Sequence, residues 1–156
     1  MATLSYLNTT HIDFGSRSMV ADTMKQLGIK RPMIVTDKGI VAAGILDKVR
    51  EAMGNEFSPE IFDGTPENPT EEATLEALAQ YKDAGCDGVI SLGGGSSMDL
   101  AKGLVLLATH EGDLTQFAAI EGGGGLIGET APHIAMPTTA GTGSEVSVGS
   151  VIITKD

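Results

Sequence analysis

Short apolar runs alternate with segments of helical periodicity along most of this chain. The apolar runs predict buried β-strands, because they lack the regular polar alternation of a half-exposed strand. They cover residues 33–36, 60–62, 88–92 and 133–136. Segments with apolar positions three and four apart predict helices at residues 16–27, 40–53, 71–84 and 97–109. This alternation indicates an α/β fold, a Rossmann-like parallel sheet flanked by helices on both faces.

Capping residues set the expected helix ends. Ser16 is the predicted N-cap of the first helix, and Gly28 ends that helix. A break near Gly44 is expected to divide the second helix. Thr70 is the predicted N-cap of the third helix, with acidic residues in its first turn. The buried face of the third helix is predicted to contain Leu75, Leu78 and Tyr81.

Three segments stand outside this alternation. Residues 4–14 predict two short strands joined near residues 8–10, and such strands could pair across a homodimer. Residues 117–132 contain four consecutive glycines without apolar periodicity, so we expect a mobile loop there. Residues 148–154 are rich in β-branched side chains and predict a strand. Since no helix follows to cover that strand, we expect either a fragment of a longer protein or a naturally short form.

Composition narrows the class of protein. A chain of 156 residues with 41% hydrophobic residues is the size of one domain with a substantial core, so residues 1–156 are predicted to form a single domain. The net charge of −11 disfavours nucleic acid and anionic membranes as partners. The single cysteine, Cys86, permits no disulfide within the chain, and no apolar run is long enough to span a bilayer. We therefore expect a cytoplasmic protein.

Two loops rich in small residues follow two of the predicted strands. Residues 93–99 read GGGSSMD and residues 137–145 read PTTAGTGSE. The first loop is either a tight turn, in which Ser96 and Asp99 form a capping box, or a cradle for a pyrophosphate. We favour the cradle, because a simple turn does not need three consecutive glycines. The second loop is either flexible or a source of hydroxyl hydrogen bonds to a nucleotide. At the ends of adjacent parallel strands the two loops would face one crevice, where open α/β sheets bind ligands.

The remaining candidate residues give weaker indications of a binding or catalytic role. Asp37 follows a predicted strand, so its carboxylate either caps a helix or accepts hydrogen bonds from an adenosine ribose. The three histidines, His11, His110 and His133, lack the spacing of metal ligands. No residue of the chain is a candidate catalytic acid, base or nucleophile, so no catalytic and no metal-binding residues are predicted.

The two loops together resemble the iron-dependent (group III) alcohol dehydrogenases. The matching segments are GGGSSMDLAKG at residues 93–103 and PTTAGTGSEVS at residues 137–147, with support from IVTDKGI at residues 34–40 and PENPT at residues 66–70. The resemblance covers essentially the whole chain. It implies an NAD(P)-binding N-terminal domain of the type found in dehydroquinate synthase.

The resemblance also implies roles for particular residues. Asp37 would bind the adenosine ribose and favour NAD over NADP, and Asn68 would lie near the cofactor. Gly94, Gly95, Ser96 and Ser97 would hold the pyrophosphate. Thr138, Thr139 and Thr142 would line the adenine and phosphate side.

The chain departs from the family in what it lacks. Family members carry a helical C-terminal domain whose aspartate and histidines bind Fe²⁺ or Zn²⁺, and this domain is expected to be absent here. Cofactor binding is therefore supported, whereas conversion of a small alcohol or aldehyde is expected to be lost or incomplete. The alternative is a non-enzymatic dinucleotide-binding or subunit-interaction module, and a different enzyme of the same broad fold is a third possibility.

Overall fold

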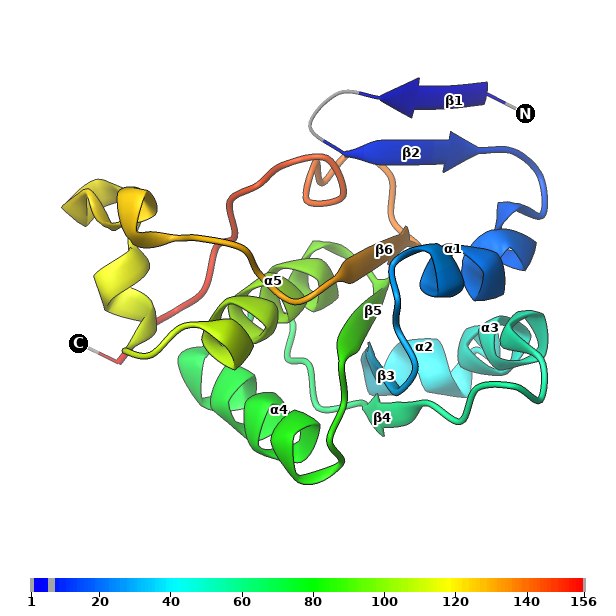
Figure 1. The fold of residues 1–156 in the computed structure, drawn as a ribbon, viewed down its shortest axis with the longest axis horizontal. Helices are drawn as coiled ribbons and strands as arrows, with labels where there is room; N and C mark the ends of the chain where they lie inside the picture. Colours follow the sequence, from blue (N-terminus) through cyan, green and yellow to red (C-terminus); the bar gives the residue numbers. More distant parts are fainter. Residues whose placement is uncertain (1, 6–7, 156) are drawn as a thin grey trace.

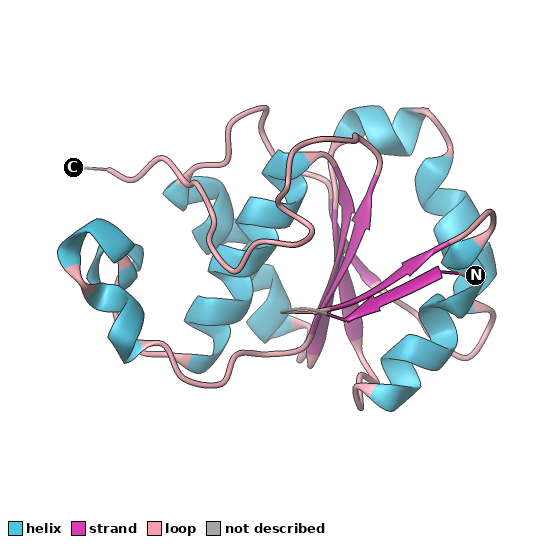
Figure 2. Ribbon diagram, turned by 90° about the horizontal axis from the view of Figure 1, so that it is seen from above, coloured by secondary structure: helices cyan, strands magenta, loops and turns pink. Residues whose placement is uncertain are grey.

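The computed structural model describes residues 2–5 and 8–155, with side-chain surroundings from residue 8 onward. Its centre is a four-stranded parallel sheet, in the spatial order β4 (Glu60–Phe62), β3 (Pro32–Val35), β5 (Gly88–Gly93) and β6 (His133–Pro137). Helices cover both faces of this sheet, as Figure 2 shows edge on. The predicted α/β class and all four predicted central strands are confirmed (Figure 1).

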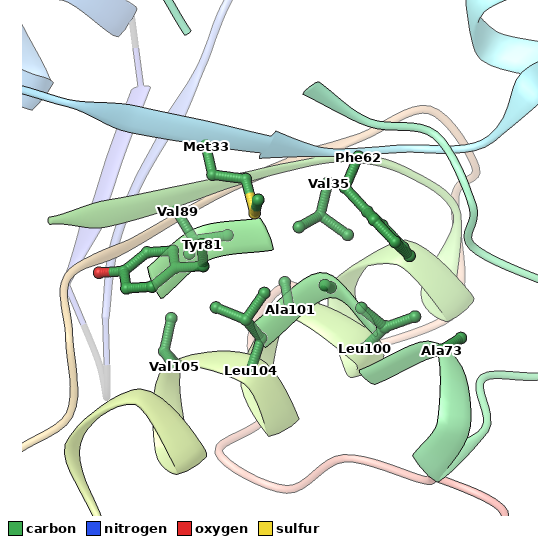
Figure 3. Close-up of a cluster of buried hydrophobic side chains, with 11 residues drawn as sticks. Met33, Val35, Phe62, Ala73, Tyr81, Val89, Leu100, Ala101, Leu104 and Val105 are labelled. Carbon is green, nitrogen blue, oxygen red and sulfur yellow. The ribbon is translucent and has the colours of Figure 1, made fainter. Parts of the chain in front are cut away.

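The sheet divides the core into two apolar clusters, because successive strand residues point to opposite faces. On one face, strand residues such as Met33, Val35 and Val89 pack against Leu100 and Leu104 of a long helix, α5 (Gly95–Thr109) (Figure 3). On the other face, the buried side chains are Ile34, Ile90 and Leu92 of the sheet, with Met24, Val49 and Met53 of the helices α1 (Val20–Gln26) and α3 (Ile45–Met53). Both faces of the central strands are buried, which is why these strands lack a polar alternation.

Two helix-end predictions differ in outcome. A 3₁₀ helix, η1 (Ser16–Met19), precedes α1, and its N-cap is Gly15, with a positive φ of 76° and no side-chain hydrogen bond. The prediction that Ser16 is an N-cap is therefore wrong, because the chain turns one residue earlier. The break near Gly44 is confirmed, since this glycine has a φ of 70° and separates α2 (Lys38–Ala42) from α3.

Helix α4 (Glu71–Asp83) begins as predicted but turns a different face inward. The Thr70 hydroxyl accepts a hydrogen bond from Ala73 N at 3.2 Å, which confirms the N-cap. Leu75, however, is 48% exposed. The buried side chains are Ala73, Thr74, Ala77 and Tyr81, so the predicted face is correct at Tyr81, partly correct at the half-buried Leu78 and wrong at Leu75. The reason is close packing against α5, where the Thr74 methyl lies 3.1 Å from the position that a Cβ atom would take at Gly103.

The two ends of the chain extend beyond the central sheet. The strands β1 (Ala2–Ser5) and β2 (Thr9–Ile12) form a separate antiparallel pair, which confirms two strands but places Thr9 and Thr10 inside the second. The expected loop at residues 117–132 instead contains parts of three short 3₁₀ helices: η2 (Leu114–Phe117), η3 (Ala119–Glu121) and η4 (Gly123–Leu126). They lie at one end of the molecule (yellow in Figure 1).

The predicted strand at residues 148–154 is wrong. This segment runs along α5 and forms only an isolated bridge between Ile153 and Thr70. Two backbone hydrogen bonds hold Ile153, from Glu71 N to Ile153 O at 2.8 Å and from Ile153 N to Pro69 O at 2.9 Å. Side chains hold the rest of the segment: Asp99 accepts a hydrogen bond from Val151 N at 3.1 Å, and Lys102 donates to Gly149 O at 2.6 Å. β-Branched residues favour a strand only where a partner strand is available.

Candidate functional site

A cleft lies at the carboxyl edge of the sheet, between β3 and β5. The chain passes from β3 to β4 on one side and then crosses back to β5 on the other, so the cleft lies where the strand order reverses. Open α/β sheets bind ligands at such a switch point. The cleft has a volume of about 610 Å³. Its lining comes from all four strand ends and consists of residues 37–40, 63–67, 94, 96, 97, 138 and 139.

The first wall of the cleft is the turn from β5 into α5. Gly93 has a φ of +156°, and a Cβ atom there would lie 2.5 Å from Ser97 Oγ, so this position requires glycine. Helix α5 begins at Gly95 with Gly94 as its N-cap, two residues before the predicted start. The proposed capping box of Ser96 and Asp99 is therefore wrong, because Ser96 already lies inside the helix. The first amides of α5 have no intrahelical acceptor and form a site suited to an anion.

The second wall is the loop after β6, and it packs directly on the first. Thr138 N donates to Gly93 O at 2.8 Å. Thr139 lies beside Gly94, with its Oγ1 atom 3.4 Å from the position of an added Cβ. The prediction that the two loops share one edge of the sheet is confirmed.

Gly95 and Thr142 lie behind this wall rather than on the cleft. A Cβ atom at Gly95 would be 3.3 Å from Thr142 Cβ and 3.3 Å from Ser144 Oγ. Thr142 Oγ1 accepts from Ser144 N at 3.3 Å and donates to Glu145 Oε2 at 3.3 Å. In the described conformation, these two predicted site residues therefore hold the second loop against the helix.

Of the two alternatives left open by the sequence, the structure confirms that Asp37 caps a helix. Its Oδ1 atom accepts from Ile40 N at 3.0 Å and caps α2. Its Oδ2 atom faces the glycine turn, 3.4 Å from where a Cβ atom would stand at Gly93. One carboxylate oxygen is thus used by the helix, while the other lies at the cleft beside the exposed Lys38.

The third wall is the segment after β4, which the sequence motifs identified only at Asn68. Asn68 itself is exposed and adjoins the cleft, whereas residues 63–67 line it. The Ser96 hydroxyl donates to the Glu67 carbonyl oxygen and ties this segment to α5. Thr65 is 8% exposed, and its hydroxyl has no hydrogen-bond partner. The rule that ligands bind at the carboxyl ends of parallel strands is the signal that could have found these residues.

The charge around the cleft is more acidic than basic. Its lining includes the carboxylates of Asp37, Asp63 and Glu67 against the single ammonium group of Lys38. A dinucleotide phosphate would therefore depend on backbone amides rather than on cations. Among residues 2–5 and 8–155, no group of three or more His, Cys, Asp and Glu side chains could hold a metal ion.

One histidine lies in a distinct environment away from the cleft. His133 Nε2 is 2.8 Å from Ser91 Oγ, between β6 and β5. Burial, reinforced by the positive charge of Lys102, lowers the pKa of His133 to about 4. The imidazole is therefore neutral at pH 7, and its geometry indicates a structural role.

Comparison with known proteins defines the family. The model of the iron-containing alcohol dehydrogenases matches residues 8–156. This chain therefore belongs to the iron-containing alcohol dehydrogenase family. None of the helices in the described part of the chain has the length and apolar character that a membrane span requires.

Individual relatives extend well beyond the length of this chain. It is 52% identical over 157 residues to 4-hydroxybutyrate dehydrogenase of Cupriavidus necator, covering 100% of this chain and 41% of that protein. It is 43% identical over 136 residues to 1,3-propanediol dehydrogenase of Klebsiella pneumoniae, covering 83% of this chain and 34% of that protein. The chain thus spans about two-fifths or less of these relatives.

The fold also matches solved structures of the family. An alcohol dehydrogenase from Oenococcus oeni superposes with a TM-score of 0.81 at 30% identity, over 91% of this chain and 37% of that chain. The sulfoacetaldehyde reductase of Bifidobacterium kashiwanohense, solved in complex with NAD⁺, shares the fold with a TM-score of 0.75 at 24% identity, over 90% of this chain and 42% of that chain.

Proposed function

We propose that this chain is the NAD-binding region of an alcohol dehydrogenase that interconverts an alcohol and an aldehyde by hydride transfer. The observation that carries this proposal is the cleft at the switch point, where the N-terminus of α5 and the loop after β6 form adjacent walls. Three consecutive glycines, residues 93–95, leave the turn into α5 without side chains. A backbone without side chains allows a pyrophosphate to approach the helix amides closely.

Each part of the cleft would hold a different part of the cofactor. The amides of Ser96 and Ser97, which line the cleft, would donate to the pyrophosphate, Gly94 would leave room for it, and Gly95 would let the second loop pack closely behind them. The Oδ2 atom of Asp37 would accept hydrogen bonds from the adenosine ribose. A carboxylate there would also repel the 2′-phosphate of NADP, so NAD is the proposed cofactor.

The remaining predicted residues would act at the edges of the same cleft. Thr138 and Thr139 line it and would donate to the adenine or phosphate groups. Thr142 would support them from behind, and Asn68 would contact the cofactor at the outer rim. When bound, NAD supplies the nicotinamide that accepts a hydride from the alcohol.

The metal that gives the family its name does not fit the described residues, which contain no suitable ligand group. We therefore assign this chain no catalytic step. The substrate proposed for the whole protein is a small alcohol or aldehyde, and 4-hydroxybutyrate is the first compound to test because of the 52% identical relative. The cytoplasmic location remains a proposal.

A subunit-interaction role is a second proposal, favoured by the N-terminal hairpin. The strands β1 and β2 form a two-stranded sheet separate from the central one. Ile12 is 55% exposed and Phe14 is fully exposed. An isolated two-stranded sheet is marginally stable, and a second copy of the chain would extend it and cover these side chains.

The cofactor proposal is tested by adding one methyl group to the cleft. Gly94 has a φ of −81°, so Gly94→Ala strains no backbone, and the added Cβ would lie 3.4 Å from Thr139 Oγ1. We expect the chain to bind NADH in a saturable manner by calorimetry and fluorescence, and Gly94→Ala to weaken binding at least tenfold. The matched control is Gly149→Ala, because nothing lies within 4 Å of a Cβ atom there. Absence of NADH binding up to millimolar concentration by the unaltered chain would overturn the proposal.

A further inference from the structure

Thr65 is a buried residue of the cleft with an unsatisfied hydroxyl group. It is 8% exposed and follows Gly64, which forms an antiparallel bridge with Asp37. Its backbone amide donates to Thr36 O at 3.3 Å, so its position beside β3 is fixed. Its Oγ1 atom is buried and has no hydrogen-bond partner.

A second threonine beside it shows how this fold satisfies a buried hydroxyl. Thr36 is fully buried, and its Oγ1 atom donates to Leu92 O at 2.7 Å. A hydroxyl buried without a partner destabilises the folded state, because it has lost its hydrogen bonds to water. Valine would fill the same space as Thr65 without this cost. The unsatisfied hydroxyl of Thr65 is therefore explained if a ligand completes its hydrogen bonds.

Asp37 indicates which ligand group is within reach. Its Oδ2 atom lies at the cleft and, under the proposed function, accepts from a ribose hydroxyl. A ribose hydroxyl both donates and accepts, whereas a carboxylate only accepts. Thr65 lines the same cleft and follows Gly64, the bridge partner of Asp37, so its hydroxyl, once turned toward the cleft, can donate to the same sugar.

We propose that Thr65 is a specificity residue whose hydroxyl hydrogen-bonds to the adenosine ribose of the bound dinucleotide. This inference rests on the proposed function and adds a contact to it. In the unliganded chain the hydroxyl is turned inward. Rotation about the Cα–Cβ bond exchanges it with the methyl group of similar size and directs it to the cleft without moving the backbone. The hydrogen bond from Ser96 to Glu67 O holds the segment in place for this contact.

The test combines variants of Thr65 with analogues that lack one sugar hydroxyl. In the full chain, Thr65→Val should weaken ADP and NADH about fivefold to tenfold, the worth of one hydrogen bond. Thr65→Ser, which keeps the hydroxyl, should restore most of the affinity. The difference in affinity between Thr65→Val and the unaltered chain should vanish with one of the two analogues, 2′-deoxy-ADP or 3′-deoxy-ADP, namely the one that lacks the hydroxyl bound by Thr65. An equal loss with both analogues would overturn the ribose contact.

Thermal unfolding separates a ligand contact from a structural role. Without ligand, Thr65→Val should raise the unfolding temperature, because it removes an unsatisfied polar group, while Thr36→Val should lower it. A lower unfolding temperature in Thr65→Val would overturn the proposal, and so would unchanged affinity for ADP. If the unaltered chain bound neither NADH nor ADP, the proposed function would fail and the contact with it. If the unaltered chain bound NADH and ADP, and Thr65→Val bound them with the same affinity, the proposed function would stand and only the Thr65 contact would fail.

Discussion

The Oδ2 atom of Asp37 faces Gly93 across the floor of the cleft, 3.4 Å from the position of an added Cβ atom. The same Cβ would lie 2.5 Å from Ser97 Oγ. The end of β3 and the start of α5 thus approach each other at a residue without a side chain. This close approach allows the capping carboxylate of α2 and the free amides of α5 to face one ligand.

The first prediction concerns this approach. Gly93→Ala should destabilise the chain by more than about 2 kcal/mol, because it adds a steric conflict to a φ of +156° that other residues rarely adopt. Gly141→Ala is the matched control: its φ is also positive, at +92°, but nothing lies within 4 Å of the added Cβ. Urea unfolding of both variants measures the difference. Equal destabilisation would mean that the conformation of Gly93, and not its close approach to Ser97, requires glycine.

The second prediction concerns the charge of Asp37. Asp37→Ser keeps an oxygen that can cap α2 but removes the carboxylate. We expect the ratio of NAD to NADP affinity to fall about tenfold or more, because a like-charge contact with the 2′-phosphate is removed. Calorimetric titration with both cofactors measures the ratio. Asp47→Ser, in the first turn of α3, is the control for loss of one negative charge.

An unchanged cofactor ratio in Asp37→Ser would show that the carboxylate serves only as a cap. A loss of folding in this variant is excluded by comparing its circular dichroism and unfolding temperature with those of the control.

The sequence predicted the parts of the fold that depend on local patterns. Residues 88–92 are apolar apart from Ser91 and show no polar alternation, which predicted that both faces of this strand are covered. Thr70 and Asp37 directly precede helices. Each side-chain oxygen accepts a hydrogen bond from the backbone amide three residues later, so both helix caps are present. The two loops were placed at one edge because parallel strands end at the same edge of a sheet.

The incorrect predictions depend on contacts between distant segments. The inward face of α4 was predicted from its leucines, but the buried face contains Ala73, Thr74 and Ala77, and the Thr74 methyl packs closely on Gly103. The segment at 148–154 has β-branched residues but no neighbouring strand. The Ser96 hydroxyl is used by Glu67, which is 29 residues away along the chain. A local sequence pattern cannot predict a hydrogen-bond partner so distant in the chain. It also cannot predict that the Thr65 hydroxyl has no partner.

The third prediction uses the pKa of His133. Its folded-state pKa of about 4 lies below the ordinary value of 6.5, so the unfolded chain binds more protons between these values. Stability should therefore fall as pH decreases from about 6.5 to about 4, by up to about 3 kcal/mol, and this contribution should be flat outside that window. His133→Gln should lose this part of the pH dependence, as measured by urea unfolding at several pH values.

A companion variant tests the cause of this shift. Ser91→Ala removes the hydrogen bond to His133 but keeps the ring buried. Because burial is the main cause of the lowered pKa, the pH dependence should remain in Ser91→Ala. Its disappearance would assign the shift to the hydrogen bond instead.

The fourth prediction concerns the N-terminal hairpin. We expect the chain to sediment as a dimer at micromolar concentration, because a second hairpin would cover Ile12 and Phe14. Replacing both residues by lysine should give a monomer with an unchanged circular dichroism spectrum. Leu75→Lys is the control, since Leu75 is 48% exposed on α4, away from the hairpin. A monomeric unaltered chain, or a dimer that persists in the double variant, would contradict the proposed interface.

The last prediction concerns catalysis by this chain alone. Removing a hydride from an unactivated alcohol requires stabilisation of the developing alkoxide, and a metal with an open coordination position provides it. Such a site needs about three or four converging ligands, and the described residues contain no group of three or more. We therefore expect no stoichiometric iron or zinc by elemental analysis, and no NAD-linked oxidation of 4-hydroxybutyrate or 1,3-propanediol. Zinc or iron bound at about one ion per chain, or turnover above background, would contradict this prediction and show that side chains not grouped in this structure come together as metal ligands. NADH binding without turnover would separate cofactor binding from catalysis, since the cleft between Asp37 and the α5 amides does not depend on the metal.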